Sequence, residues 1–282
     1  GLVGPDGAGK TTTLRLFAAL MNPSAGRARV LGYDTVRHAS RIKPRIGYVA
    51  QRFSLYGDLT VLENIFFFAE LFAVPRPERR PRVERLLGFA GLGEFRHRRA
   101  AHLSGGMQRK LALACVLIHT PELVLLDEPT TGVDPVSRRE FWEILSELHL
   151  QGVTLVLTTP YMDEAELCTR VGLMAKGSLI ICDTPTQIKR QLDAELVALW
   201  PTDVRLARAA LAHLPDLREI QMYGDQLRIL VDDAQSAIPR IASVLAEHHV
   251  AVRELRPTRA RMEEAFVSLT TRWNAAPPRE KG

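Results

Sequence analysis

The spacing of apolar residues changes twice between Leu103 and Pro135. Ser104 can cap a helix whose apolar positions recur at helical spacing, namely Met107, Leu111, Ala114, Cys115 and Ile118. The run 123–126 then lacks any polar alternation, which is typical of a parallel strand buried on both faces. Asp127 and Glu128 follow this strand, at the end where open α/β sheets bind their ligands. On these residues alone, a core helix and a core strand that happens to end in acids is the simpler interpretation.

Similar patterns predict alternating strands and helices over the first two thirds of the chain. Buried strands are expected at 46–49 and 153–158, and helices after Thr11 and over most of 59–103. Residues 171–182 are predicted to form a hairpin that turns at residues 176–178. Strands that alternate with helices in this way indicate an α/β fold.

The pattern changes after Asp183. From Glu195 the predicted order is strand, helix, strand, strand, helix, strand, at residues 196–200, 204–214, 218–223, 226–231, 237–247 and 250–255. This order is typical of a small α+β ferredoxin-like domain, and a last helix is expected over 262–270. We therefore expect an α/β domain at 1–185, a linker at 186–194, an accessory domain at 195–271 and a disordered tail at 272–282. His248 and His249 lack cysteine or acidic neighbours at ligand spacing and are predicted to lie on the surface.

Composition adds few constraints. The chain has 282 residues, which is enough for two domains. Its net charge is +5, and because the arginines are spread along the sequence, this charge does not by itself argue for nucleic-acid binding. The three cysteines, Cys115, Cys168 and Cys182, are far apart, so we expect a reducing cytosol and neither a disulfide framework nor a zinc site. No segment is long and apolar enough to span a membrane and no signal peptide is visible, so a soluble chain is expected.

Residues 4–11 match the P-loop pattern G-x-x-x-x-G-K-[ST]. The glycines allow backbone N–H groups to surround phosphate oxygens, Lys10 can reach the terminal phosphates, and the Thr11 hydroxyl can ligate Mg²⁺. The phosphate-binding candidates are Gly4, Pro5, Asp6, Gly7, Ala8, Gly9, Lys10, Thr11 and Thr12. Because residue 1 is Gly and only 1–3 precede the motif, we expect the α/β core to be N-terminally truncated.

Taken in order, these motifs resemble the nucleotide-binding subunit of ABC transporters. The P-loop is followed by a glutamine-loop residue, Gln51, by an L-S-G-G signature at 103–106, and by a Walker B strand at 123–127 with Glu128 and the D-loop residue Asp134. The resemblance covers about residues 1–185 and implies a P-loop NTPase core of the ABC type with a helical subdomain. The C-terminal part resembles the accessory domain of drug- and antibiotic-type exporters.

The resemblance also implies roles and partners. ATP and Mg²⁺ would be the cofactors, with Thr11, Gln51 and Asp127 around the metal and with Glu128 and Gln51 as catalytic residues. The signature residues would close on the ATP of a second ABC ATPase domain in a head-to-tail dimer; they are Ser104, Gly105 and Gly106. The implied protein is an ATPase on the cytoplasmic, inner face of the cell membrane. It would power export of a small molecule through ABC-2-type permease subunits and bind no nucleic acid.

The sequence departs from the family at one catalytic position. After the strand at 153–158, the family's γ-phosphate-contacting histidine is replaced by Pro160, which has no donor. Together with Asp6 and Met107, this resembles the first half of a tandem exporter ATPase, and such halves are often degenerate. The alternative is therefore a half that binds ATP and completes the partner's site without hydrolysing efficiently. A soluble ABC protein acting on ribosomes or DNA is disfavoured by the short 51–103 interval, and a kinase by the signature.

Overall fold

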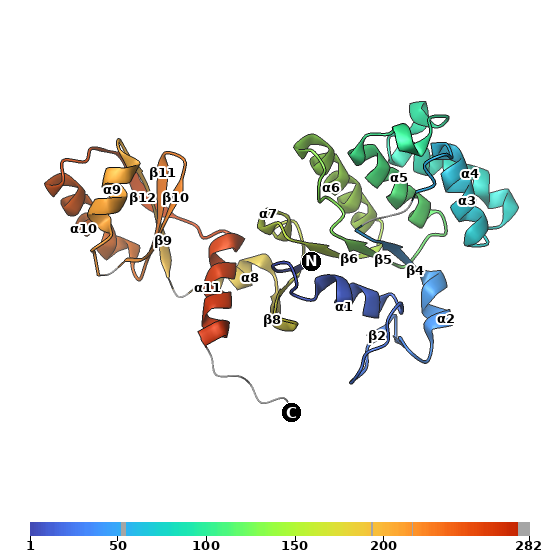
Figure 1. Ribbon diagram of the computed structural model, residues 1–282, viewed down its shortest axis with the longest axis horizontal. Coiled ribbons are helices and arrows are strands. Elements are labelled where there is room, and N and C mark those ends of the chain that lie inside the picture. The colour runs from blue at the N-terminus through green and yellow to red at the C-terminus, as the bar shows by residue number, and fades with distance from the viewer. Residues whose placement is uncertain (52–54, 193, 216, 276–282) are drawn as a thin grey trace. The chain divides into compact units, whose positions relative to one another are not determined.

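The computed structural model describes residues 1–51, 55–192, 194–215 and 217–275, which form two compact units (Figure 1). The first unit comprises Gly1–Ala165 and Val171–Leu179, and the second comprises Glu166–Arg170 and Ile180–Gly282. The division thus differs from the expected boundary at residue 185. Residues 166–170 lie in sequence between two parts of the first unit, Gly1–Ala165 and Val171–Leu179, but belong to the second unit.

A six-stranded sheet with the order β4-β5-β6-β1-β7-β8 forms the centre of the first unit. Its strands are β1 (Leu2–Val3), β4 (Ile46–Val49), β5 (Leu123–Asp127), β6 (Thr154–Thr159), β7 (Val171–Ala175) and β8 (Ser178–Asp183). β5 pairs in parallel with β4 and β6, and all five of its residues are buried, which confirms the strand predicted from the unbroken apolar run. β7 and β8 form the expected hairpin, with positive φ at Lys176 and Gly177 as a type I′ turn requires.

Helices cover both faces of this sheet, with α1 on one side and α5 and α6 on the other (Figure 1). The helices are α1 (Lys10–Phe17), α2 (Ala39–Ile42), α3 (Val61–Leu71), α4 (Arg76–Phe89), α5 (Gly105–Leu117), α6 (Pro135–Leu150) and α7 (Met162–Ala165). A small two-stranded sheet pairs β2 (Arg29–Val30) with β3 (Tyr33–Asp34). Short 3-10 turns lie at Lys43–Arg45, Gly93–Phe95 and Ala100–His102. α3 and α4 form the helical segment expected between residues 59 and 103.

Local capping explains where α3, α5 and α6 begin. The Thr60 side chain accepts the Glu63 N–H at the start of α3, and Glu63 returns the bond to the Thr60 N–H. Ser104 caps α5 and Asp134 caps α6 through single side-chain acceptors. α5 and α6 therefore begin beside the loops that carry the signature and the D-loop residue.

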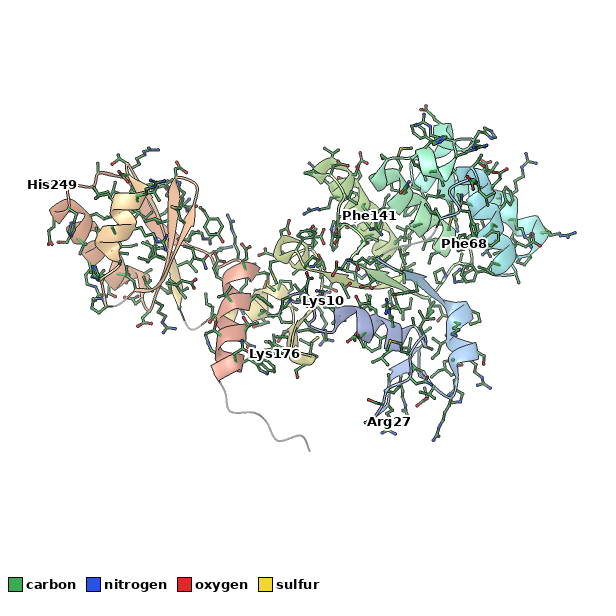
Figure 2. All side chains as sticks on the ribbon, viewed as in Figure 1. Lys10, Arg27, Phe68, Phe141, Lys176 and His249 are labelled. Atoms are coloured by element: carbon green, nitrogen blue, oxygen red, sulfur yellow. The ribbon has the colours of Figure 1, made fainter. Side chains whose placement is uncertain are left out.

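The second unit is a ferredoxin-like sandwich, as its pattern predicts. It contains β9 (Glu195–Pro201), α9 (Val204–Leu211), β10 (Leu217–Tyr223), β11 (Gln226–Val231), α10 (Ala234–Glu247) and β12 (Val252–Thr258). The strands pair antiparallel in the order β10-β11-β9-β12, and α9 and α10 pack on one apolar face of the sheet. His248 and His249 are exposed as predicted, and Figure 2 shows His249 at the periphery of this unit.

Two helices of the second unit correct the expected boundaries. α8 (Pro185–Arg190) occupies most of the predicted linker 186–194, because Thr184 caps a helix whose Ile188 is fully buried. α11 (Met262–Ala275) continues past the predicted end at residue 270 and into the expected tail 272–282. The rest of that tail, residues 276–282, lies outside the described residues. No helix in the described part of the chain is both long and apolar enough to cross a bilayer.

Candidate nucleotide-binding site

The P-loop joins β1 to α1 in a conformation that only glycine permits at three positions. A Cβ on Gly4 would lie 2.2 Å from the Met174 carbonyl oxygen, and Gly7 and Gly9 have φ of 76° and 97°. Gly9 is the residue that precedes the first turn of α1, so the loop ends at a helix N-terminus, where anions bind favourably. Of the other predicted phosphate-binding residues, Pro5, Asp6 and Thr12 are exposed and Ala8 is buried.

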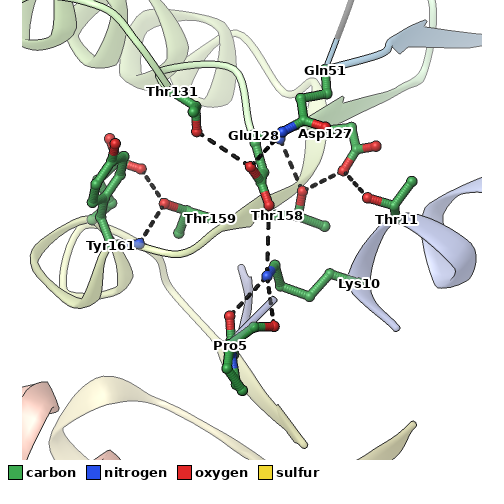
Figure 3. A network of polar contacts seen from close by, with 12 residues as sticks. Pro5, Lys10, Thr11, Gln51, Asp127, Glu128, Thr131, Thr158, Thr159 and Tyr161 are labelled. Atoms are coloured by element: carbon green, nitrogen blue, oxygen red, sulfur yellow. Dashed lines mark hydrogen bonds and ion pairs between the residues drawn. The ribbon is translucent and has the colours of Figure 1, made fainter. Parts of the chain in front are cut away.

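Lys10 is the first residue of α1 and is only 5% exposed. Its Nζ donates to the carbonyl oxygens of Gly4, at 2.8 Å, and Pro5, at 3.1 Å. The same atom lies 3.6 Å from Glu128 Oε1 (Figure 3). A buried ammonium with carbonyl and carboxylate neighbours is held within the loop, where an entering phosphate can replace those neighbours.

Thr11 and Asp127 meet at the carboxyl end of β5. The Thr11 hydroxyl donates to Asp127 Oδ1 at 3.0 Å, and the Thr158 hydroxyl donates to the same oxygen at 2.7 Å. The β5–β6 register causes the second contact, because it places Asp127 opposite Thr158. Asp127 is 1% exposed, so its carboxylate is fixed by both hydroxyls.

Adjacent hydroxyl and carboxylate oxygens are ligands that Mg²⁺ accepts. Across the described residues, no group of three or more His, Cys, Asp and Glu side chains could enclose a metal ion. Mg²⁺ does not need such an enclosure, because it keeps several waters and usually binds one or two protein oxygens together with phosphates. Thr11 and Asp127 therefore fit a magnesium ion that arrives with a nucleotide.

Glu128 begins the turn after β5 and has a φ of 48°, a left-handed conformation that a non-glycine residue seldom adopts. Its backbone N–H donates to the Thr158 hydroxyl at 2.9 Å. Its side-chain Oε2 accepts from Gln51 Nε2 at 2.9 Å and from the Thr131 hydroxyl at 3.3 Å (Figure 3). Lys10, Gln51 and Thr131 thus fix a carboxylate that can accept a proton or orient a water molecule.

Gln51 reaches Glu128 from the loop after β4. Its carbonyl oxygen accepts a hydrogen bond from Arg109 Nη1 at 2.8 Å, which ties this loop to α5. Burial lowers the pKa of the Arg109 guanidinium below its ordinary value. A cavity of about 450 Å³ lies beside these residues and is bordered also by Gly105 and Thr131.

The signature residues stand apart from the P-loop. Ser104 caps α5 by accepting the Met107 N–H at 3.3 Å, and Ser104 and Gly105 are exposed. Gly106 is buried, and a Cβ there would lie 2.5 Å from the Ser137 side chain on α6. In the described part of the chain, no hydrogen bond or ion pair joins these three residues to the P-loop.

The loop after β6 contains no side-chain donor at Pro160. The Tyr161 N–H donates to the Thr159 hydroxyl oxygen at 3.1 Å, so the next backbone donor is used inside the loop. Sequence reasoning missed the hydroxyls that organise this region, which belong to Thr131, Thr158 and Thr159, and the buried carboxylate of Glu164. The only signal in the sequence was that Thr158 and Thr159 end β6 and that Thr131 lies in the turn after β5.

Comparisons with known proteins agree with this geometry. Residues 1–131 match the family model described as ABC transporter. The chain is 40% identical over 273 residues to the probable multidrug ABC transporter ATP-binding protein YbhF of Escherichia coli, covering 95% of this chain and 46% of that protein. It is 32% identical over 278 residues to the linearmycin resistance ATP-binding protein LnrL of Bacillus subtilis, covering 96% of this chain and 89% of that protein.

A solved structure has the same architecture. The dimeric post-hydrolysis structure of the ATP-binding cassette MJ0796 bound to ADP and Pi matches with a TM-score of 0.59 and 28% identity. The match covers 65% of this chain and 83% of that one. The chain spans about half the length of YbhF and most of the length of LnrL. The fold, the P-loop geometry and these relatives lead to one conclusion: the chain belongs to the ABC transporter family.

Proposed function

We propose that the full protein binds Mg-ATP at this P-loop, hydrolyses it, and thereby powers the export of a small molecule through membrane subunits. The observation that supports this most directly is the convergence of Lys10, the Thr11–Asp127 pair and Glu128 at one edge of the sheet. The names of the relatives, a multidrug transporter protein and an antibiotic resistance protein, support export as the process. The protein would act on the cytoplasmic face of the cell membrane, held there by its membrane partners.

Each residue has a distinct task in this proposal. Lys10 exchanges its carbonyl partners for the terminal phosphates, and the P-loop amides bind the remaining phosphate oxygens. Thr11 and Asp127, with Gln51, hold Mg²⁺, which when bound neutralises phosphate charge. Glu128 orients the attacking water, and its positive φ and three side-chain partners keep its carboxylate directed at the site.

A second ABC ATPase domain would complete the site. The exposed Ser104 and Gly105 at the start of α5 are available to another chain's nucleotide, where the helix N-terminus favours phosphate. The dimeric form of MJ0796 supports pairing with a second domain, which we propose to be head-to-tail. ABC-2-type permeases are the proposed membrane partners, and no nucleic acid is involved.

Nucleotide binding by the full-length protein tests the proposal. Lys10→Ala should abolish ATP binding because it removes the main cationic partner of the phosphates. Lys43→Ala, which changes an exposed lysine outside the site, is the matched control and should bind like the wild type. ATP binding by Lys10→Ala at wild-type affinity would disprove the assignment.

A second candidate is a degenerate half that binds ATP but hydrolyses it poorly. It is favoured by Pro160, which offers no donor, and by the internal Thr159–Tyr161 bond in the same loop. Loss of one positioned donor costs on the order of 10²-fold to 10³-fold in rate. In the assembled transporter, Glu128→Gln should then change turnover only modestly, whereas the equivalent change in the partner domain should nearly stop it.

The same assembly separates the two candidates. Equal losses from the two glutamate changes would mean that both sites hydrolyse ATP, which excludes the degenerate half. Pro160→His should raise turnover if the loop can reach the γ-phosphate. No gain in a folded Pro160→His variant would mean that the proline is not what limits this site.

A further inference from the structure

A second carboxylate is buried near the site and has no role in the motifs discussed so far. Glu164 lies on α7 and is 1% exposed. Its Oε1 accepts the Thr130 hydroxyl at 2.6 Å, and its Oε2 accepts the Thr159 hydroxyl. Arg138 Nε lies 3.8 Å from Oε1, an ion-pair distance that is too long for a hydrogen bond. A carboxylate buried this deeply remains in the core only when such partners compensate its charge.

The partners of Glu164 come from the two loops that flank the candidate catalytic residues. Thr130 belongs to the turn that begins at Glu128, where the Thr131 N–H donates to the Glu128 carbonyl and the Val133 N–H donates to the Thr130 carbonyl. Fixing Thr130 therefore fixes the turn on which Glu128 takes its left-handed conformation. The same turn leads directly into the D-loop residue Asp134 and α6.

Thr159 belongs to the other loop, which follows β6 and contains Pro160. Because the Thr159 hydroxyl donates to Glu164, its oxygen is oriented to accept the Tyr161 N–H at 3.1 Å. Arg138 also lies over the Tyr161 ring, with its guanidinium carbon 4.4 Å from the ring centroid. Glu164 thus binds the residue before Pro160, and its ion-pair partner Arg138 contacts the residue after Pro160.

We propose that Glu164 is a positioning residue that sets the turn of Glu128 and the Pro160 loop as one unit. It acts through the hydroxyls of Thr130 and Thr159, and Arg138 extends the connection to the first turn of α6. In a chain whose loop has no histidine to contact the nucleotide, this internal connection is what orders the loop relative to Glu128. The inference rests on the proposed function for its effect on turnover, but not for its effect on the two loops.

Amide hydrogen exchange of the full-length protein tests the connection without nucleotide. Glu164→Gln keeps the size of the side chain, but the glutamine amide has only one acceptor oxygen in place of the two carboxylate oxygens. It therefore cannot accept both hydroxyl hydrogen bonds in the same way. Exchange should accelerate in both loops, at residues 130–133 and at Tyr161. Thr130→Val should also accelerate exchange at Tyr161, on the other loop, whereas Thr130→Ser should restore the wild-type rate. Glu143→Gln is the matched control, because Glu143 is an exposed glutamate whose ion-pair partner is Arg139, which lies outside this connection.

ATP turnover tests the functional consequence. The measurement is made with the full protein and its partner domain, whose own catalytic glutamate is changed to Gln so that only this site turns over. Glu164→Gln should lower kcat by about 10-fold to 100-fold, because displaced catalytic groups lose rate without losing substrate affinity. ATP affinity should stay within about twofold of the parent, since the two hydroxyls that Glu164 holds, of Thr130 and Thr159, lie outside the P-loop. Combining Thr130→Val with Glu164→Gln should cost little more than either change alone.

Several results would overturn the proposal. Wild-type exchange in both loops of Glu164→Gln would mean that the carboxylate does not hold them. Additive effects of the two changes would mean that they act independently, and an unchanged kcat in an active parent would remove the positioning role. If Glu164→Gln does not fold, amide exchange at Tyr161 in Thr130→Val and Thr130→Ser still tests the connection between the two loops. If the assembly with the partner's glutamate changed to Gln shows no turnover, that result counts against the proposed function and not against the connection. The exchange data would still test whether Glu164 holds the two loops together.

Discussion

Gly105 and Gly106 are neighbours in the first turn of α5, and the structure makes opposite demands on them. A Cβ on Gly106 would lie 2.5 Å from both Cβ and Oγ of Ser137, a distance that real side chains do not reach. A Cβ on Gly105 would have no heavy atom within 4 Å. We predict that Gly106→Ala destabilises the protein and that Gly105→Ala does not, because only the first forces α5 and α6 apart.

The two variants form a matched pair for estimating the steric cost. Each replaces glycine by alanine in a helix, which by itself stabilises by about 0.5–1 kcal/mol. Forcing extra volume into a packed contact costs about 1–3 kcal/mol. The difference in unfolding free energy between the two variants should therefore be about 1–3 kcal/mol, since the helix term cancels.

Urea unfolding of the full-length variants, followed by circular dichroism, measures this difference. Ser137→Gly removes the opposing side chain and should recover most of the loss in the Gly106→Ala background. If Gly106→Ala were as stable as Gly105→Ala, the close approach of α5 and α6 would be wrong. Gly105→Ala also separates stability from function, because a stable variant that blocks partner-dependent turnover would support a role for this exposed glycine at the partner's nucleotide.

Two further predictions concern buried charges and a buried histidine. Arg228 and Glu264 form an ion pair at 3.0 Å in which both side chains are at most 5% exposed. Arg228→Met should lower the free energy of unfolding in urea by about 3–5 kcal/mol, because it leaves the Glu264 charge buried without its partner, and adding Glu264→Leu should recover most of this loss. No recovery in the double variant would mean that the pair is not desolvated. Burial lowers the pKa of His119, whose ring stacks on Phe72 and contacts the Ile46 carbonyl oxygen at 3.1 Å. The unfolded state therefore binds the proton more readily than the folded state does. The neutral, buried His119 thus contributes to the free energy of unfolding above a pH of about 6.5, and this contribution is lost as the pH falls. His119→Gln should flatten the loss of stability from pH 7 to pH 5, and an unchanged pH profile would contradict the assignment.

The sequence alone determined the features that depend on neighbouring residues. The P-loop was readable because backbone N–H groups around phosphate require glycine at fixed spacing, and three of its glycines do occupy positions closed to other residues. The run before Asp127 predicted β5 because a strand covered on both faces has no polar alternation. The cap at Ser104, and the strand and helix order of the second unit, were likewise local signals.

Only the tertiary structure decided which distant groups meet. Strand register brings Thr158 to Asp127, and nothing in either segment by itself indicates that register. The partners of Glu164 depend on how two loops and a helix pack around one carboxylate, so a buried acid on α7 could not be distinguished from a solvated one in the sequence.

The same reason explains the corrected boundaries. Residues 166–170 belong to the second unit because their contacts are with segments distant in sequence. The end of α11 beyond residue 270 is a helix terminus, which local sequence specifies only weakly. Spacing along the chain fixes local conformation and candidate chemistry. Long-range pairing decides which polar groups are buried together, and thereby which side chains hold the catalytic residues in place.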